Sequence, residues 1–266
     1  MSKTTAFSQR NLKELIRDPL SYLFCLGFPL VMLIVMTLVN NGIESSTANL
    51  PPEAQALSAA PTIFRIDKLT GGIAVFGLTF LMLFTCLSVA KDRSGAFLMR
   101  LYATPMRSGS FIAGYMLPTF VLGIIQIVIT LAASLVIALV KGVDLSVGGL
   151  ALSAVVLMPT VVMFIALGVL FGTLFSDKSA PGLCSIVISL ASFLGGIWFD
   201  ADSTGGVLKK LCDVLPFIHS VKAARLACAL EFENILPHLL ISTAYAAVLT
   251  VLSIIVFKSR MKADLQ

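Results

Sequence analysis

Residues 111–140 read FIAGYMLPTFVLGIIQIVITLAASLVIALV, thirty residues without Asp, Glu, Lys, Arg or His. A helix of about 20 apolar residues crosses a hydrocarbon core roughly 30 Å thick. This stretch is therefore long enough to span a membrane with tilt or protruding ends. Five more uncharged runs share its character, at 20–39, 69–90, 149–175, 181–199 and 239–257. The pattern predicts an all-α membrane protein with six transmembrane helices.

The overall composition agrees with a chain whose main solvent is lipid. Hydrophobic residues make up 58% of the sequence and charged residues 12%, about half the charge of a soluble domain. The longest segments between runs, 40–68 and 200–238, are too short for an ordinary soluble domain. We therefore expect residues 1–266 to form a single transmembrane domain. Because no small-residue cleavage site closes the first run, we interpret it as an uncleaved span rather than a signal peptide.

The distribution of charge predicts the orientation. With the N-terminus inside, the cytoplasmic segments hold 12 Lys/Arg and 5 Asp/Glu, and the external segments hold 7 and 9. Lys and Arg concentrate on the cytoplasmic side of membrane proteins. The sequence therefore predicts a multi-pass protein of the cell (inner or plasma) membrane with both termini in the cytoplasm. The net charge of +5 follows this membrane pattern, so it does not point to a nucleic-acid partner.

The segment before the first run has the pattern of an amphipathic helix over residues 5–18. Its apolar face holds Leu12, Leu15 and Ile16, with Phe7 nearby, and the charged positions are Arg10, Lys13, Glu14 and Arg17. Such a helix lies in the membrane interface with its basic side chains toward anionic headgroups; a solvated stub is the alternative. Pro19 pushes Asp18 out of helical geometry, so we expect a bend before the chain enters the membrane.

The most structured polar segment follows the second run and reads KDRSGAFLMRLYATPMRSGS over residues 91–110. Ser94 can cap a short helix that begins near Gly95, and Thr104-Pro105 would end it. The apolar face of that helix would consist of Phe97, Leu98 and Leu101. A loop that only joins two spans needs no apolar face. The segment is therefore predicted either to lie on the membrane surface or to dock into a cytoplasmic partner.

Residues 200–238 have the pattern of two short helices around Pro216. Apolar side chains fall at helical spacing in the first, at Val207, Leu208, Leu211, Val214 and Leu215, and the second covers 221–230. The pair either lies on or dips into the outer leaflet, or forms an ordinary ordered loop. Cys212 and Cys228 share this segment, and we favour free thiols over a disulfide.

Within the runs, small residues and prolines give packing signals. Gly168 and Gly172 form a small-xxx-small pair that permits close helix contact. Pro118 and Pro159 lie inside the third and fourth runs, where prolines are tolerated and can kink a helix. The turn at 176–180 is so short that the fourth and fifth spans should be antiparallel neighbours.

The sequence lacks the motifs of several kinds of chemistry. It contains no G-x-x-x-x-G-K-[ST], G-x-S-x-G or H-E-x-x-H. No Asp, Glu, Lys, Arg or His lies in the six runs, which weighs against a membrane enzyme and against a proton-coupled carrier. Neither a metal nor a cofactor is expected on this chain. If the protein moves a solute uphill, its energy should enter from outside the spans.

These features together resemble the permease subunits of type-2 ABC exporters, over essentially the whole chain. The family pattern combines six spans, Arg17-Asp18-Pro19 after an amphipathic helix, and a first cytoplasmic loop of the form [ED]-R-x-G-x₂-L-x₅-TP. The loop motif here is Asp92, Arg93, Ser94, Gly95, Leu98, Thr104 and Pro105. Leu215-Pro216 followed by Arg225 also fits. Asp92 departs from the family, which more often has Glu at this position.

The resemblance implies two permease subunits, either identical copies or homologues, that pair with two separate ABC ATPase subunits. ATP and magnesium would bind to those partners. The loop helix and the N-terminal helix would then sit on the ATPase. The residues implied in ATPase coupling are Asp92, Arg93, Ser94, Gly95, Leu98, Leu101, Thr104 and Pro105, together with Leu12, Leu15, Ile16 and Arg17 of the N-terminal helix.

The resemblance also implies that the second and fifth spans line the substrate path. Phe76, Phe80 and Phe84 recur every fourth residue, which is either packing or an apolar lining, and Phe193 and Trp198 are secondary candidates. Without a fixed charge, such a path favours a hydrophobic or amphipathic compound, drug- or antibiotic-like, over inorganic ions. The alternatives are a lipid or lipid-linked glycan exporter and a non-transporting membrane scaffold or sensor.

Overall fold

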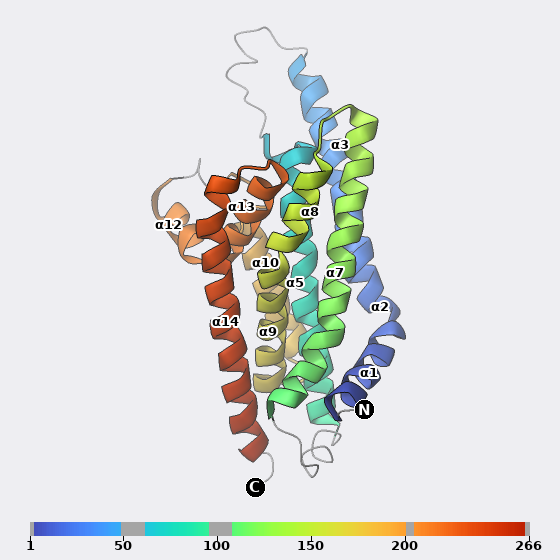
Figure 1. Ribbon diagram of the computed structural model, residues 1–266, viewed down its shortest axis with the longest axis vertical. Helices are drawn as coiled ribbons and strands as arrows, with labels where there is room; N and C mark the ends of the chain where they lie inside the picture. Colours follow the sequence, from blue (N-terminus) through green and yellow to red (C-terminus); the bar gives the residue numbers. More distant parts are fainter. Residues whose placement is uncertain (1–2, 49–61, 96–107, 201–204, 264–266) are drawn as a thin grey trace.

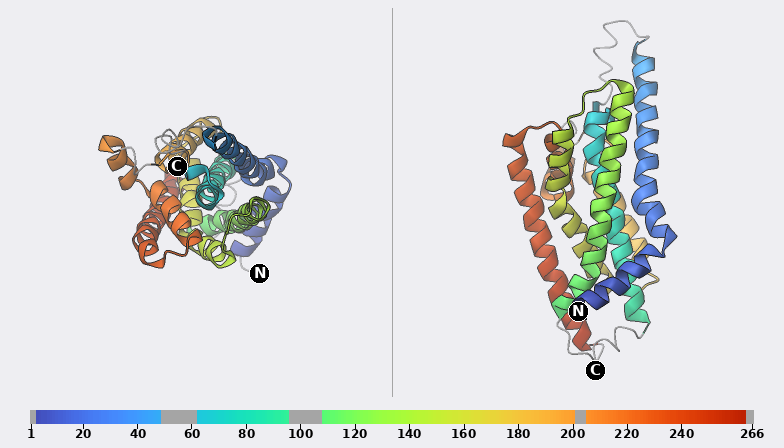
Figure 2. Two further views of the ribbon diagram at one scale, coloured as in Figure 1. Left: turned by 90° about the horizontal axis from the view of Figure 1, so that it is seen from above. Right: turned by 45° about the vertical axis from the view of Figure 1, so that its right-hand side comes forward.

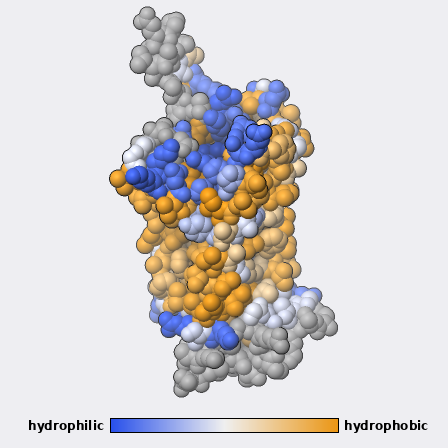
Figure 3. Space-filling view, turned by 60° about the vertical axis from the view of Figure 1, so that its left-hand side comes forward, coloured by the Kyte–Doolittle hydropathy of each residue, from blue (hydrophilic) through white to orange (hydrophobic). Residues whose placement is uncertain are grey.

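The computed structural model describes residues 3–48, 62–95, 108–200 and 205–263, and the ordered elements in these ranges are helices (Figure 1). The long helices run side by side. Helix α1 (Lys3–Ile16) and the C-terminal part of α14 (Phe232–Ala263) lie at one end, hereafter the α1 end. The opposite end holds α12 (Gly206–Val214) and α13 (Pro216–Cys228) and is called the α13 end. A belt of apolar surface separates the polar ends (Figure 3).

The chain bends sharply where α1 ends. Asp18 has extended backbone (φ −94°, ψ 101°), and its carboxylate accepts hydrogen bonds from the Leu20 amide at 3.1 Å and the Ser21 hydroxyl at 2.7 Å. This cap starts α2 (Pro19–Tyr22), as the proline predicted. A π turn, η1 (Leu23–Gly27), connects α2 to α3 (Phe28–Ala48). As a result, α1 crosses the bundle end at an angle to the long helices (Figure 2, right).

Helix α5 (Ile66–Ser94), which follows the short η2 (Thr62–Phe64), is the central element. Most of its side chains are buried, because α3, α7, α9, α10 and α13 all pack around it. It extends beyond the predicted span 69–90 at both ends. That extension carries Lys91, Asp92 and Arg93 on helical backbone.

The third and fourth runs fold differently although each contains a proline. Helix α7 (Ser108–Lys141) continues through Pro118. The fourth run is divided into α8 (Val147–Val156) and α9 (Met158–Leu174), with the break at Leu157. Pro159 has no N–H to donate to the carbonyl four residues back, which explains why a helix ends and restarts here. The run 149–175, expected as one continuous helix, is therefore two.

Glycines bring α9 against α5. A Cβ at Gly168 would lie 2.6 Å from the Met82 carbonyl oxygen, and one at Gly172 would lie 2.6 Å from the Cys86 carbonyl oxygen. Only glycine fits at either contact. The small-xxx-small spacing was therefore correctly interpreted as a packing signal.

The fifth run forms a shorter helix than predicted. Helix α10 (Ala180–Leu194) has 15 residues and ends at Gly195-Gly196, where Gly196 has φ 64°. In the described part of the chain, five helical stretches are long and apolar enough to cross a membrane: Pro19–Ala48, Ile66–Ser94, Gly109–Lys141, Val147–Leu174 and Phe232–Arg260. The expected fifth span, 181–199, thus appears as a short apolar helix packed mainly against α5.

The two helices predicted around Pro216 are present. Pro216 occupies the first turn of α13, where its missing N–H costs nothing. Helix α13 is buried between α5, α8 and α14, whereas α12 exposes Val207, Leu211 and Val214. All five cysteines, each within the described ranges, are buried free thiols, as favoured for Cys212 and Cys228.

Candidate functional site

Three helices meet at Asp92 at the α1 end. The side chain is only 5% exposed, and both of its oxygens accept hydrogen bonds from Arg10 of α1 at 2.8 Å. Tyr115 of α7 donates its hydroxyl to Asp92 Oδ2 at 2.9 Å. A buried carboxylate is costly unless it is paired and hydrogen-bonded, and a bidentate guanidinium is a strong partner for it. Asp92 thus fastens α1 and α7 to the end of α5.

The ion pair continues outward from Asp92. Arg10 also contacts Glu14 at 3.0 Å, one turn further along α1, and Glu14 contacts Lys91 of α5 at 3.2 Å. The hydrogen bonds that Arg10 donates to Asp92 raise the pKa of Arg10, outweighing the opposite effect of burial. The outer contacts are exposed and contribute little, so the inner pair with Asp92 carries most of the attachment.

Helix α1 packs on the bundle through Phe7 and Asn11. Phe7 lies over Gly114, where a Cβ would overlap its ring, and meets Tyr115 edge-to-face at 5.0 Å. Asn11 donates its side-chain amide to the Gly114 carbonyl at 3.0 Å.

Of the three side chains expected on the apolar face of the interfacial helix, Ile16 is 57% exposed at the surface of the protein. Leu12 and Leu15 are half-buried, and Arg17 is exposed. Arg10, one of the charged positions of α1, bonds Asp92 of the bundle. The pattern of α1 alone could not reveal this contact or the notch at Gly114, because both depend on residues of other helices.

The next three residues of the loop motif, Arg93, Ser94 and Gly95, form the last turn and the C-cap of α5. Arg93 donates to the Thr173 carbonyl of α9, and the Ser94 hydroxyl donates to the Lys91 carbonyl at 3.1 Å. Gly95 ends the helix with its amide bonded to the same carbonyl. Ser94 therefore belongs to the last turn of α5. The helix expected after it, with Leu98, Leu101, Thr104 and Pro105, lies outside the described residues.

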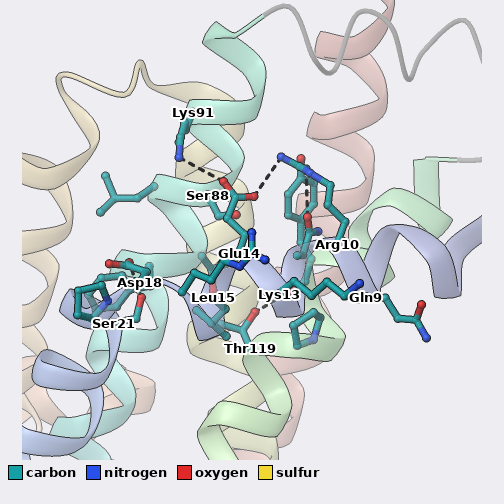
Figure 4. A pocket seen from close by; sticks show the side chains of 18 of the residues that line it. Gln9, Arg10, Lys13, Glu14, Leu15, Asp18, Ser21, Ser88, Lys91 and Thr119 are labelled. Carbon is teal, nitrogen blue, oxygen red and sulfur yellow. Dashed lines mark hydrogen bonds and ion pairs between the residues drawn. The ribbon is translucent and has the colours of Figure 1, made fainter.

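A cavity of about 1120 Å³ opens beside this network, between α1, α2, α5 and α7 (Figure 4). Its polar lining includes Arg10, Lys13, Glu14, Arg17, Asp18, Ser88 and Lys91. Its apolar lining includes Leu15, Phe84, Leu87 and Pro118. Charged and apolar walls thus share one cavity.

The phenylalanines predicted on the second span form part of an aromatic cluster. Phe76, Phe80 and Phe84 of α5 are buried. Phe80 stacks on Phe24 with ring centroids 5.9 Å apart and meets Phe28 at 5.5 Å.

The cluster extends to one of the two secondary candidates. Trp198 meets Phe76 at 5.4 Å, whereas Phe193 is 60% exposed on α10 and does not join the cluster. Sequence reasoning missed Phe24 and Phe28. Their spacing of four residues, matching that of the α5 stripe, was the available signal.

At the α13 end, the site residues Pro216 and Arg225 hold α13 in place. The half-buried Arg225 guanidinium donates to the Lys68 carbonyl at 2.9 Å and to the Gly196 carbonyl at 3.0 Å. Burial lowers the pKa of Arg225 to about 10, so it remains a cation at neutral pH. One side chain therefore joins α13 to the start of α5 and to the turn after α10.

Two histidines, His219 and His238, lie together at this end. His219 Nδ1 and His238 Nδ1 are 2.8 Å apart, and His219 Nε2 is 2.9 Å from the Asp213 carbonyl oxygen. They come from α13 and α14, so no local pattern could have paired them. In the described residues, no group of three or more His, Cys, Asp or Glu side chains is arranged to hold a metal ion.

Long apolar helices, an apolar belt and polar ends define a multi-pass membrane protein. The profile of a family described as ABC-2 type transporter matches residues 2–228. No curated protein matches the chain. The match covers most of the sequence, and the chain therefore belongs to the ABC-2 type transporter family. It is a permease component, not itself an enzyme, of the kind that works with an ABC ATPase.

Proposed function

We propose that this chain is the transmembrane subunit of an ATP-driven exporter of hydrophobic or amphipathic, drug- or antibiotic-like compounds, coupled to a separate ATPase subunit at its α1 end. A second permease subunit would complete the path. The observation that carries the proposal is the attachment at Asp92. One buried carboxylate ties α1 and α7 to α5 just before the segment that the family resemblance places on the ATPase.

The contacts support a route for coupling. A force on α1 reaches α5 through the two 2.8 Å hydrogen bonds between Arg10 and Asp92. Helix α5 is a single helix from Ile66 to Ser94, and three turns of it carry the aromatic cluster. Packed helices transmit displacement because protein interiors are dense. Movement at the α1 end would therefore displace the rings of Phe76, Phe80 and Phe84.

The character of the aromatic cluster supports the substrate class. Its rings come from α3, η1, α5 and the segment after α10, and Phe24 and Phe28 are each 37% exposed at its edge. No charged side chain belongs to the cluster in the described part of the chain. An apolar or amphipathic compound could exchange contacts with these rings, whereas a highly charged solute would find no counterion.

The test co-expresses the chain with its ABC ATPase, places the purified complex in nanodiscs, and measures ATP hydrolysis with and without amphipathic compounds. We expect Arg10→Gln to retain the complex but to reduce stimulation by roughly five- to a hundredfold, the usual range of coupling between sites. The charge swap of Arg10→Asp with Asp92→Arg should restore part of it. Lys258→Gln, an exposed change at the same end, is the matched control.

Full stimulation in a folded Arg10→Gln complex would overturn the coupling route. If no amphipathic compound stimulates hydrolysis but a lipid or lipid-linked glycan does, the alternative exporter class is correct. Absence of any stimulation, with the ATPase bound, would favour the scaffold or sensor.

A further inference from the structure

We propose that the cavity between α1, α2, α5 and α7 binds an anionic phospholipid, with Lys13 and Arg17 as contacts for its phosphate. This inference concerns a site separate from the aromatic cluster and does not depend on the export proposal. It rests on three properties of the cavity: its position, its charge balance and its divided lining.

The position of the cavity matches that of lipid headgroups. It lies at the α1 end, where α1 crosses the bundle at an angle and the apolar belt gives way to polar side chains (Figures 2 and 3). Its volume, about 1120 Å³, slightly exceeds the roughly 300–1,000 Å³ of pockets for small molecules. It is large enough for a headgroup together with part of an acyl chain.

The charges of the cavity leave two cations without carboxylate partners. Arg10 and Lys91 are engaged with Glu14, and Arg10 also with Asp92. The Asp18 carboxylate is occupied by the Leu20 amide and the Ser21 hydroxyl. In the described part of the chain, neither Lys13 nor Arg17 has an ion-pair partner.

Lys13 and Arg17 also lie four residues apart on α1. Like charges at this spacing repel each other and weaken a helix, although the negative end of the α1 dipole favours cations in its last turn. An anion bound between the two would relieve the repulsion. Basic side chains at a membrane surface attract anionic lipid in the same way.

The hydroxyls of the wall provide a further donor. Thr85 and Thr119 each donate to the carbonyl four residues back, as buried helical threonines commonly do. Ser88, whose side chain lies on the cavity wall in Figure 4, has no hydrogen-bond partner among the described residues. Its hydroxyl is therefore available to a phosphate oxygen or to the ester region of a lipid.

The apolar part of the lining selects an amphiphile over a free anion. Leu15, Phe84, Leu87 and Pro118 face the same cavity as the cations. An inorganic phosphate would leave this surface in contact with water, whereas an acyl chain would cover it, at about 25 cal/mol per Å² of apolar surface. An anionic phospholipid suits both parts of the lining, because its phosphate would meet the cations and its acyl chain would cover the apolar side chains.

The experiment uses the full-length chain in detergent and measures bound lipid by native mass spectrometry. The probes are phosphatidylglycerol, phosphatidylcholine and inorganic phosphate at equal concentrations. We expect retention of phosphatidylglycerol to exceed that of phosphatidylcholine by roughly tenfold, and the difference to shrink at high salt. Preference for phosphatidylcholine, or equal retention, would overturn the proposal.

Two variants locate the site. Lys13→Gln with Arg17→Gln should abolish the preference, whereas Lys258→Gln with Arg260→Gln, an equal loss of exposed charge at the same end, should leave it intact. Leu87→Trp, which fills the apolar wall without changing charge, should lower retention of both lipids. If both charge pairs act alike, the attraction is a property of the surface and not of the cavity. Displacement of phosphatidylglycerol by equimolar inorganic phosphate would show that the site takes a free anion instead.

Discussion

Asp92 shows how much of this end of the molecule depends on one side chain. Its two oxygens accept three hydrogen bonds from two other helices. The shorter reach of Asp, compared with the Glu that the family more often has, is matched by Arg10, which approaches bidentately. Both carboxylate oxygens of Asp92 are therefore paired with Arg10 in this chain, and α1 is attached to α5.

We expect Asp92→Asn to lower the stability of the protein by about 1–3 kcal/mol, because a neutral amide cannot accept both guanidinium hydrogen bonds and leaves Arg10 with only the exposed Glu14 as counterion. The estimate is below the full cost of a buried pair because Arg10 is 35% exposed. Thermal unfolding in detergent measures the effect. Tyr115→Phe, which removes one of the three hydrogen bonds, should cost less; the reverse order would contradict this account of Asp92.

At Phe80, we expect truncation to alter substrate preference more than assembly. The Phe80→Ala change removes a ring that contacts Phe24, Phe28 and Phe76, and opens a space within the aromatic cluster. Export assays with compounds of increasing size should show a changed ranking, while pull-down of the ATPase remains the same. Phe193→Ala, on the exposed surface of α10, is the control. Unchanged export of every compound would mean that the rings only pack.

At the scale of elements, glycines determine how closely α5 and α9 approach. We expect Gly168→Ala to destabilise the protein by about 1–3 kcal/mol, because its Cβ would overlap the Met82 carbonyl and a rigid backbone cannot move aside. Gly182→Ala in α10 meets nothing within 4 Å and should be neutral or stabilising by up to about 1 kcal/mol. Thermal unfolding of both variants tests the contact; equal effects would contradict it.

The elements themselves were largely predictable, because runs without charge can satisfy their backbone only as helices. The exceptions have local causes. The helix of the fourth run breaks at Leu157 because Pro159 has no N–H to donate. Helix α7 nevertheless continues through Pro118, so the presence of a proline alone does not determine whether a helix breaks. Helix α10 stops early because Gly195-Gly196 permits a turn that the apolar pattern does not reveal.

The site was less predictable than the elements. The loop motif located Asp92, but its partners Arg10 and Tyr115 are separated from it by 82 and 23 residues. Helical spacing in α1 indicated an apolar face, but it registers hydrophobicity and did not reveal that Phe7 packs into the notch at Gly114. The aromatic stripe on α5 was found, whereas the rings opposite it on α3 and η1 required the packing of two helices to be known.

At the scale of the whole molecule, the charge pattern predicts which end faces the cytoplasm. Helix α14 is continuous from Phe232 to Ala263, so Glu231 and Lys258 lie toward opposite ends. We expect a membrane-impermeant maleimide to label Glu231→Cys in right-side-out vesicles and Lys258→Cys in inside-out vesicles. The native cysteines are buried and give a low background. The reverse labelling would invert the orientation, and labelling from one side would contradict a spanning α14.

The π turn at Leu23–Gly27 contains one residue more than an ordinary α-helical turn. There the Phe28 amide bonds the Leu23 carbonyl, five positions back, where an ordinary helix would use four. Shortening the turn by one residue would rotate the segment before it by about a hundred degrees relative to α3. This rotation would move Phe24 away from Phe80. Deletion of Leu26 should fix the rotated arrangement. With Phe24→Cys and Phe80→Cys introduced, a cross-link between the two side chains should form in the chain that keeps Leu26 and fail in the chain that lacks it. The π turn of the first span therefore sets the orientation of α1 and Phe24 relative to α3.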